Sequence, residues 1–224
     1  KTDLGQEIRD FFVAKPSMKF ILSDYSQIEL RVLAHLSQDS EMINILKKES
    51  ADIHAETAAR IFNEPIDNVN SEMRRKAKEV NFGLIYGMEA FGLSKSLNIS
   101  QKEAKKLIDA YFDQFPKVKG FLENVVSNAE KNTFTTTLIG RKRYIRELSS
   151  SNFQLKAMGK RIAMNAPIQG TASDIMKIAM IKVRSNLPKF NNANLLLQIH
   201  DEIVVESNNK DIEKVSKMVS DNMK

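Results

Sequence analysis

The sequence contains no cysteine and little glycine or proline, and each shortage narrows the class of protein. Without cysteine the chain has neither a disulfide framework nor a thiolate metal site, which fits a reducing compartment. Eight glycines and five prolines among 224 residues, with 42% hydrophobic residues, favour a globular, helix-rich protein with ample length for a core. No run of about 18 apolar residues is present, so we expect no transmembrane helix. The first residues, "KTDLGQEIRDFF", lack an apolar signal core, so we expect no export signal.

Basic residues outnumber acidic ones, and the excess is concentrated in one segment. The formal net charge is +6. Residues 141–161 carry seven basic side chains and one acidic side chain, so the local excess equals that of the whole chain. The seven are Arg141, Lys142, Arg143, Arg146, Lys156, Lys160 and Arg161. A focused basic patch favours a polyanionic partner, but an ordinary solvated surface has the same composition, and both interpretations stay open here.

Apolar periodicity predicts a mixed, helix-rich chain. A strand is expected over 18–26, a β-hairpin over 132–145 and a strand–turn–strand unit over 195–207. Helices are expected over 27–37, 39–49, 52–62 and 71–87. Further helical segments are expected to follow up to about residue 131, and Pro116 should break one of them. A long helical region is expected over 151–187, with an interruption near "NAPIQG", and a final helix over 211–224. In the helix over 71–87, Ser71 is the expected N-cap and Gly87 the expected end.

The strand–turn–strand unit carries adjacent carboxylates in an apolar setting, "LLLQIHDEIVVES" (195–207). An Asp at a hairpin tip is common because it caps its own backbone, and this purely structural interpretation stays open. However, a two-residue turn usually requires Gly or Asn, and carboxylates against a buried sheet need neutralising, for instance by a divalent metal. Asp24, at the end of the strand over 18–26, is the expected partner of Asp201. Such a pair sharing two Mg²⁺ ions would suit in-line phosphoryl transfer.

Four side chains recur every four residues along the helix expected over 71–87: Arg74, Lys78, Phe82 and Tyr86. They lie along one side of a helix, drifting by about 40° per step. The two cations lie nearer the helix N-terminus, whose positive dipole also favours anions. This order predicts a ligand with phosphates at one end and a flat base at the other. The alternative is that the aromatics belong to the core and the cations to the surface.

A second row with the same spacing is Arg161, Asn165 and Gln169. Guanidinium and amide donors on one helical face can reach the acceptors that base pairs present in the minor groove, which hardly depend on sequence. Hydrogen bonding between this helix and a loop explains the spacing equally well.

Three segments of the chain resemble the polymerase motifs of the DNA polymerase I family, also called family A. They are "DYSQIELR" (24–31), "RRKAKEVNFGLIYG" (74–87) and "HDE" (200–202). The segments "DIHAETAARIF", "YFDQFPKVKGFL" and "GKRIAMNAPIQGTASDIMK" resemble intervening family segments in the right order. The resemblance implies an α+β fold: a helix-rich right-hand polymerase palm with an antiparallel sheet, over 1–36 and 132–224, and helical fingers over 37–131.

The resemblance also implies a role for each matching residue. The catalytic residues would be Asp24, Asp201, Glu202 and Lys78, and the metal ligands Asp24, Asp201 and the backbone carbonyl of Tyr25. The nucleotide site would contain Gln27, Glu29, His54, Arg74, Lys78, Phe82 and Tyr86. Contacts to primer and template would come from Arg9, Arg161, Asn165, Gln169, Gln198 and His200.

Within the nucleotide site the resemblance assigns finer roles. Arg74, Lys78 and His54 would contact the phosphates, and Lys78 would protonate the leaving pyrophosphate. Phe82 and Tyr86 would flank the base and sugar. Glu29 would block a ribose 2′-hydroxyl.

The implied activity is template-directed, DNA-dependent DNA synthesis in replication or repair, with release of pyrophosphate. It would need two Mg²⁺ ions, for which Mn²⁺ can substitute, primer-template DNA and deoxynucleoside triphosphates. We expect a monomer without a membrane partner, in the bacterial cytoplasm or in a DNA-containing organelle of plastid or mitochondrial type. The family's thumb, exonuclease and 5′-nuclease would lie upstream, and family members usually continue for some tens of residues beyond this segment.

Two other classes fit part of the pattern. A two-metal nuclease would use the acidic clusters but has no role for the Arg–Lys–Phe–Tyr helix. A DNA-binding module without chemistry would use the basic patch, but the carboxylates would repel DNA. A single-subunit RNA polymerase of the phage type shares related motifs, whereas Glu29 and Phe82 favour deoxynucleotides. Magnesium-dependent primer extension separates the polymerase from the nuclease and the binding module.

Overall fold

The computed structural model describes residues 3–48 and 52–224, and the chain divides into two compact units. The first unit combines Lys1–Ser26 with Ser173–Lys224, and the second consists of Gln27–Ala172. Helix α9 (Phe153–Asn186) contributes its N-terminal part to the second unit and its C-terminal part to the first. The expected boundaries of palm and fingers, 1–36, 37–131 and 132–224, stay predictions beside this division.

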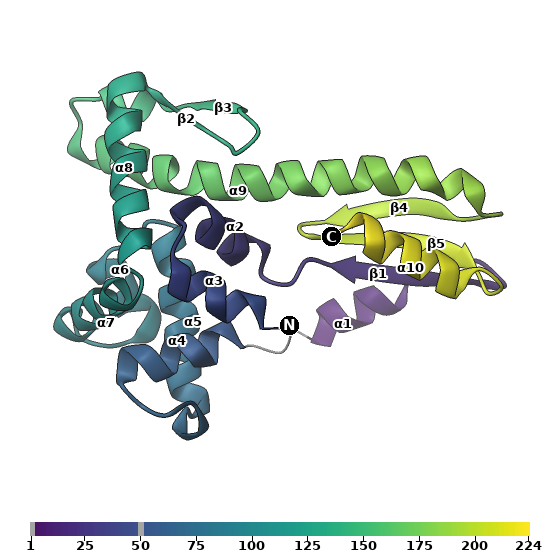
Figure 1. The fold of residues 1–224 in the computed structure, drawn as a ribbon, viewed down its shortest axis with the longest axis horizontal. Helices are drawn as coiled ribbons and strands as arrows, with labels where there is room; N and C mark the ends of the chain where they lie inside the picture. Colours follow the sequence, from purple (N-terminus) through teal and green to yellow (C-terminus); the bar gives the residue numbers. More distant parts are fainter. Residues whose placement is uncertain (1–2, 49–51) are drawn as a thin grey trace. The chain divides into compact units, whose positions relative to one another are not determined.

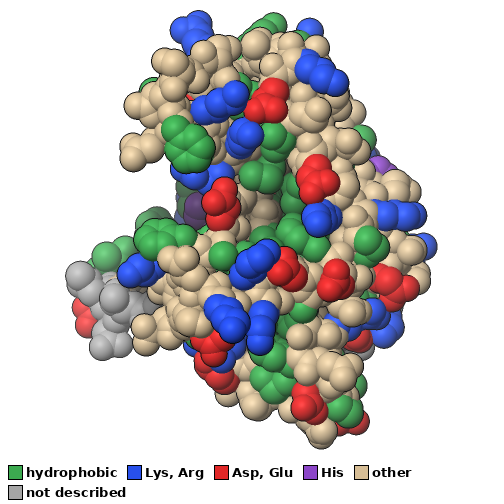
Figure 2. Space-filling model, turned by 90° about the vertical axis from the view of Figure 1, so that its left-hand side faces the viewer, with side chains coloured by type: hydrophobic (Ala, Val, Ile, Leu, Met, Phe, Trp, Pro, Cys, Tyr) green, Lys and Arg blue, Asp and Glu red, His purple; other side chains and the backbone are tan. Residues whose placement is uncertain are grey.

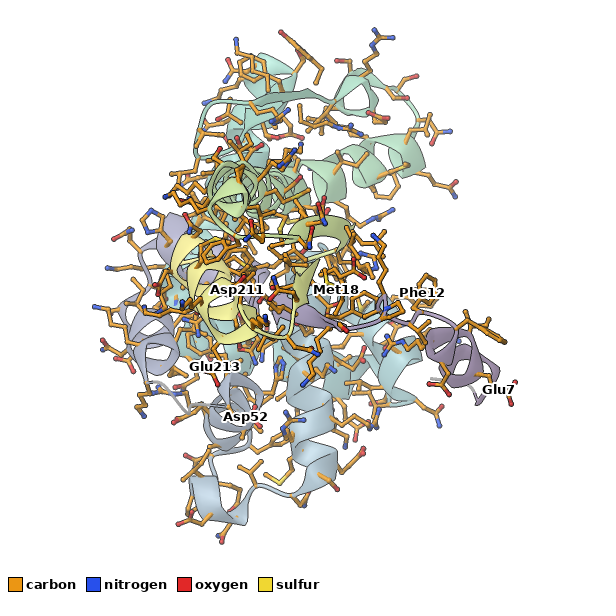
Figure 3. All side chains as sticks on the ribbon, turned by 90° about the vertical axis from the view of Figure 1, so that its right-hand side faces the viewer. Glu7, Phe12, Met18, Asp52, Asp211 and Glu213 are labelled. Atoms are coloured by element: carbon orange, nitrogen blue, oxygen red, sulfur yellow. The ribbon has the colours of Figure 1, made fainter. Side chains whose placement is uncertain are left out.

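A three-stranded antiparallel sheet forms the centre of the first unit. Its strands lie in the order β1–β5–β4 (Figure 1). The strands are β1 (Met18–Asp24), β5 (Glu202–Asn208) and β4 (Asn194–Ile199). The unit also contains the helices α1 (Asp3–Asp10) and α10 (Ile212–Asn222) and the short 3₁₀ turn Leu187–Lys189. Figure 3 labels Met18 at the start of β1 and Asp211 just before α10.

The core of this unit lies between one face of the sheet and two helices. Ile21 of β1 lies opposite Val205 of β5, and both belong to the core together with apolar residues of α9 and α10. Asp24 lies opposite Glu202. Along β5, Glu202 directly precedes Ile203, which belongs to the core together with Val205. Since side chains alternate between faces along a strand, Asp24 and Glu202 share the face away from this core.

The hairpin between β4 and β5 has a two-residue tip, His200–Asp201, because Ile199 pairs with Glu202. His200 adopts φ 56°, the left-handed value that such a turn requires. The Gln198 amide group donates a hydrogen bond to the His200 carbonyl at 2.9 Å. The predicted strand–turn–strand unit is therefore present, and His supplies the positive φ for which Gly or Asn is the usual residue.

Helices make up most of the second unit, together with one two-stranded antiparallel hairpin. The helices are α2 (Ile28–Ser37), α3 (Ser40–Lys47), α4 (Ile53–Phe62), α5 (Ser71–Ile85), α6 (Ala90–Leu97), α7 (Gln101–Gln114) and α8 (Pro116–Asn132), with 3₁₀ turns at Ile66–Asn68 and Arg146–Ser149. The hairpin consists of β2 (Phe134–Thr136) and β3 (Lys142–Tyr144). The buried Asp39 carboxylate caps two helices, accepting from the Met42 N–H of α3 and the Lys117 N–H of α8. Of the helix predicted over 39–49, residue 49 lies outside the described residues.

Two local predictions were wrong. Helix α9 is continuous over Phe153–Asn186 with Pro167 inside it, although an interruption near "NAPIQG" was expected. The Thr171 hydroxyl donates to the Pro167 carbonyl at 2.6 Å within the helix, and it accepts from the Leu138 N–H at 3.0 Å, which joins the helix to the chain that follows β2. The N-cap of α5 is Asn70, which accepts from the Met73 N–H, and Ser71 is the first helical residue. Gly87 ends this segment as predicted, with φ 67°.

Candidate active site and nucleic-acid interface

Three carboxylates from distant parts of the sequence meet in the first unit. Asp24 ends β1 opposite Glu202, which begins β5. The Tyr25 N–H donates to the Asp201 carbonyl at 3.1 Å, which fixes the end of β1 against the hairpin tip. Tyr25 is partly buried against the core of this unit, so its backbone is anchored beside the carboxylates.

The carboxylates repel one another. Loss of surrounding water raises the pKa of the Asp24 carboxyl, and the negative charges of Asp201 and Glu202 raise it further, against a smaller lowering by the Tyr25 N–H. A bound cation would relieve this repulsion. The donor set is two carboxylates and a backbone carbonyl, all hard oxygen ligands of the kind that Mg²⁺ prefers.

Among the described residues, no group of three or more His, Asp or Glu side chains is arranged to hold a metal ion by itself. Mg²⁺ usually keeps several waters and shares its remaining positions with substrate phosphates. Asp24, Asp201 and the Tyr25 carbonyl therefore suit a metal that is completed by substrate, and the acidic cluster is compatible with the expected ions.

The row of Arg74, Lys78, Phe82 and Tyr86 lies on the accessible side of α5. Arg74 and Lys78 are exposed, Tyr86 is exposed at the helix end and Phe82 is half-buried. The buried residues of this helix are Ala77, Val80, Asn81, Gly83, Leu84 and Ile85. Neither aromatic is therefore a core residue, which favours the ligand-facing interpretation of the row.

Asp52 joins the start of α4 to the cationic end of this row. Its side chain caps α4 by accepting from the His54 and Ala55 N–H groups at 3.0 and 3.3 Å, and it accepts from Arg74 Nε at 2.5 Å. Figure 3 labels Asp52 at this helix start. Burial acts to raise the pKa of the Asp52 carboxyl, but these hydrogen bonds and the charge of Arg74 outweigh it and lower the pKa. Arg74 is thus held by an ionised carboxylate.

His54 is buried beside α5. Its Nδ1 lies 3.1 Å from the amide nitrogen of Asn81, and its ring centroid lies 5.5 Å from that of Phe82. Burial lowers the pKa of His54 to about 4, with Asp52 raising it and the positive charges of Arg74 and Lys78 lowering it. The histidine is therefore neutral at physiological pH.

Glu29 and Tyr86 form a direct hydrogen bond. The Tyr86 hydroxyl donates to Glu29 Oε2 at 3.0 Å, which joins α2 to the end of α5. Gln27, just before α2, adopts a left-handed backbone with φ 54°. The sequence placed Glu29 and Tyr86 in one pocket only through the family resemblance, because nothing in their spacing predicts this contact across 57 positions.

Two residues of the second row, Asn165 and Gln169, lie beside the β2–β3 hairpin. Asn165 and Gln169 line a hollow of about 480 Å³ together with Thr135, Thr136, Thr137, Arg141, Lys142, Arg143 and neighbouring residues of α9. The side-chain oxygen of Asn165 is buried and has no hydrogen-bond partner among the described residues. Figure 2 shows several Lys and Arg side chains in the upper part of its view, where Figure 1 places this hairpin.

Arg161 lies where the end of α5 meets α9. A Cβ atom on Gly87 would lie 2.9 Å from Cγ and 3.2 Å from Cα of Arg161, so the absence of a side chain permits this close approach. Arg161 thereby adjoins the helix that carries the Arg–Lys–Phe–Tyr row. The remaining expected DNA contacts belong to the first unit: Arg9 is in the last turn of α1, and Gln198 and His200 are exposed on the β4–β5 hairpin.

Some functional neighbours were missed by sequence reasoning. Asp52 stands at an N-cap position ahead of a helix, which is a readable capping signal. Asn81 is a polar residue on the buried side of α5, at a helical position between apolar residues, and this pattern marks a buried hydrogen-bonded group. Glu130 of α8 pairs with Lys160 at 3.3 Å and Lys156 at 3.9 Å, which reduces the charge of the patch over 141–161.

Comparison with known proteins identifies the class. The family model "DNA polymerase family A" matches residues 1–224, so the chain belongs to that family. Among curated relatives, DNA polymerase I of Caldicellulosiruptor bescii is 48% identical over 217 residues, and that of Bacillus subtilis is 46% identical over 223 residues. These alignments cover 96% and 98% of this chain but 25% of each relative, so the chain spans about a quarter of their length.

A solved structure extends the similarity to the fold. The POL domain of Pol1 from M. smegmatis, in complex with DNA primer-template and dNTP, superposes with a TM-score of 0.94 at 41% identity. The superposition covers 100% of this chain and 40% of that one. The predicted α+β polymerase fold with antiparallel sheets is thereby confirmed. Within the described residues, no helix combines the length and the apolar character that crossing a membrane requires.

Proposed function

We propose that this chain carries the nucleotide-adding site of a DNA-directed DNA polymerase, which extends a primer 3′ end on a template and releases pyrophosphate. The observation that carries the proposal is the meeting of Asp24 with Asp201 and Glu202 at the end of β1. The resemblance of their segments to family motifs assigns these residues to the metal site, and the chain belongs to a family whose named relatives are DNA polymerases. The proposal includes a palm over 1–36 and 132–224 and fingers over 37–131.

Asp24, Asp201 and the Tyr25 carbonyl would hold two Mg²⁺ ions, or Mn²⁺ in their place, with Glu202 in support. When bound, such ions supply the positive charge that stabilises the transferring phosphoryl group. In the second unit, Arg74, Lys78 and His54 bind the triphosphate, and Lys78 gives a proton to the leaving pyrophosphate. Phe82 and Tyr86 flank the base and sugar, with Gln27 and Glu29 beside them.

Duplex DNA is the proposed macromolecular partner. Arg161, Asn165 and Gln169 present donors to the minor groove, and the buried unpaired oxygen of Asn165 suits a polar ligand or water in the adjoining hollow. Arg9, Gln198 and His200 contact primer and template from the first unit. We propose a monomer acting in DNA replication or repair inside a bacterial cell, since the named relatives come from bacteria.

Primer extension by the Asp24→Asn and Asp201→Asn variants tests the function. Each substitution should nearly abolish Mg²⁺-dependent nucleotide addition and leave duplex binding largely intact, because an amide cannot supply the charge that the ions require. Asp109→Asn is the matched control, since Asp109 is an exposed carboxylate on α7 paired with Lys105.

Three results would contradict the proposal. A variant that keeps more than about a tenth of the activity would remove its residue from the metal site, because losing a metal should cost several kcal/mol. Mg²⁺-dependent DNA cleavage without nucleotide addition would indicate a nuclease. Duplex binding without either reaction would indicate a binding module.

A further inference from the structure

A buried hydrogen-bonded cluster adjoins the proposed triphosphate site. Asn81 is fully buried on α5, and its amide nitrogen lies 3.1 Å from His54 Nδ1 and 3.2 Å from the Thr57 hydroxyl. The Thr57 hydroxyl also lies 3.4 Å from the Asn81 oxygen. A buried amide is costly unless it is hydrogen-bonded, so Asn81 is held in place by these partners on α4.

The two ring nitrogens of His54 have different surroundings. Nδ1 faces the Asn81 amide, and no described residue forms a hydrogen bond with Nε2. Nε2 is therefore the ring nitrogen without a hydrogen bond to the described residues, on a side chain that is only 4% exposed. Phosphate oxygens accept hydrogen bonds, so a neutral ring that contacts a triphosphate must carry its proton on Nε2 and leave Nδ1 as an acceptor.

We propose that Asn81 is a positioning residue that donates a hydrogen bond to His54 Nδ1 and so keeps the ring proton on Nε2. The Nε2–H group then donates a hydrogen bond to a triphosphate oxygen. This inference rests on the proposed function, in which His54 contacts the nucleotide phosphates. The charge for triphosphate binding then comes from Arg74 and Lys78, and His54 contributes a directed donor.

The charges around the ring are consistent with this division. Asp52, Arg74 and Lys78 are the charged groups that act on His54, and burial is the main cause that lowers its pKa. Arg74 is itself paired with Asp52. With the ring neutral, its Nε2–H donor persists across the neutral pH range, whereas a free histidine changes its protonation there.

Nitrogen-15 NMR of the histidine side chains tests the tautomer directly in the whole chain. The sequence has three histidines, so the His54 signals can be assigned by their loss in His54→Gln. The wild-type protein without nucleotide should show a bare Nδ1 and a protonated Nε2, with no titration between about pH 6 and 9. A deoxynucleoside triphosphate with Mg²⁺ should then shift Nε2–H. A protonated Nδ1, an imidazolium at neutral pH or an unshifted Nε2–H in nucleotide-bound protein would each overturn the proposal.

Asn81→Asp provides the second measurement. A carboxylate at this position accepts a hydrogen bond, so it should place a proton on Nδ1 and give His54 a titration near neutral pH. Above that pH the bare Nε2 would face the triphosphate. The ratio of the variant's KM for nucleotide to the wild-type KM should therefore rise about tenfold from pH 6 to pH 9. Asn70→Asp is the control, since it adds the same charge to the capping position of the same helix and should leave this ratio flat.

The outcomes separate this proposal from the function on which it rests. A chain that extends primers but has a protonated Nδ1, or whose Asn81→Asp variant folds with an unchanged pH profile of KM, refutes the role of Asn81 alone. A chain with the expected tautomer that neither binds nor adds nucleotide refutes the proposed function, and the phosphate contact of His54 falls with it.

Discussion

At the scale of single residues, the hydrogen bond between Glu29 and Tyr86 fixes the side chains that would lie beside the sugar in the proposed nucleotide site. The Tyr86 hydroxyl donates to Glu29 Oε2 at 3.0 Å, so the carboxylate is held in one direction by a side chain of another helix. A ribose 2′-hydroxyl that enters beside this pair would lose its hydrating water and clash with the two side chains. Burying or clashing one hydroxyl costs a few kcal/mol, which corresponds to roughly a hundredfold in selectivity.

We therefore expect Glu29→Ala to increase ribonucleotide incorporation relative to deoxynucleotide. Competing incorporation of the two nucleotides by wild type and variant measures this ratio. Glu29→Gln keeps the bulk and an acceptor for Tyr86, so it should change the ratio much less. Tyr86→Phe removes the hydrogen bond and keeps the ring, so it should have an intermediate effect. An unchanged ratio in Glu29→Ala would leave Glu29 as an ordinary helix residue.

Asp24 should reduce stability while it supports activity. Its raised pKa means that the folded protein holds the Asp24 proton more tightly than the unfolded chain. The stability that this group contributes is therefore fully present below its ordinary pKa of 3.8 and is lost as the pH rises through the folded value. In EDTA at neutral pH, Asp24→Asn should raise the unfolding temperature because it removes the repulsion from Asp201 and Glu202.

Thermal unfolding against pH and Mg²⁺ measures this effect. The advantage of Asp24→Asn should shrink as the pH falls through the raised pKa of the folded wild-type carboxyl, and it should be gone below the ordinary value of 3.8. Mg²⁺ should raise the unfolding temperature of the wild type more than that of the variant. A variant that is less stable than wild type in EDTA at every pH would show that the carboxylate is held by favourable contacts.

At the scale of elements, α5 has a buried face that packs and an exposed face that is available to a ligand. Its buried face, which includes Ala77, Val80 and Leu84, attaches the helix to the second unit, and its open face presents Arg74 and Lys78. Lys78→Ala should therefore impair nucleotide binding and chemistry far more than Lys102→Ala, since Lys102 is an exposed residue of the first turn of α7. Single-turnover nucleotide addition compares the two, and equal losses would refute a ligand-binding role for the row.

Local sequence patterns predicted most elements and left the contacts between them open. Four-residue spacing was sufficient to place Arg74, Lys78, Phe82 and Tyr86 on one side of α5, because helical periodicity is a local property. Periodicity could not decide whether α9 passes through Pro167, because a proline can either end a helix or be accommodated within it. The pairing of Asp24 with Glu202 depends on the strand order β1–β5–β4, which no short segment encodes.

At the scale of the whole molecule, we expect DNA binding to depend on where the basic residues lie more than on the net charge. The net charge of +6 equals the excess over 141–161, but Glu130 from outside that segment pairs with Lys156 and Lys160. The accessible positive charge is then concentrated at the β2–β3 hairpin. Arg141, Lys142 and Arg143 are exposed there and line the same hollow as Asn165 and Gln169. This grouping places the expected phosphate contacts beside the expected minor-groove contacts.

Neutralising Arg141, Lys142 and Arg143 together should weaken duplex binding alike at all sequences and lower its dependence on salt. Phosphate contacts carry no sequence information, and each one releases counterions, so the slope of log affinity against log salt should fall by about 0.9 for every phosphate that is no longer neutralised. The matched control neutralises the exposed lysines Lys102, Lys210 and Lys214, which changes the net charge by the same amount. Titrations of duplex binding over a range of salt concentrations compare the two triple variants. If both change the slope equally, net charge governs binding; if the hairpin variant leaves the slope unchanged, the hairpin does not contact DNA.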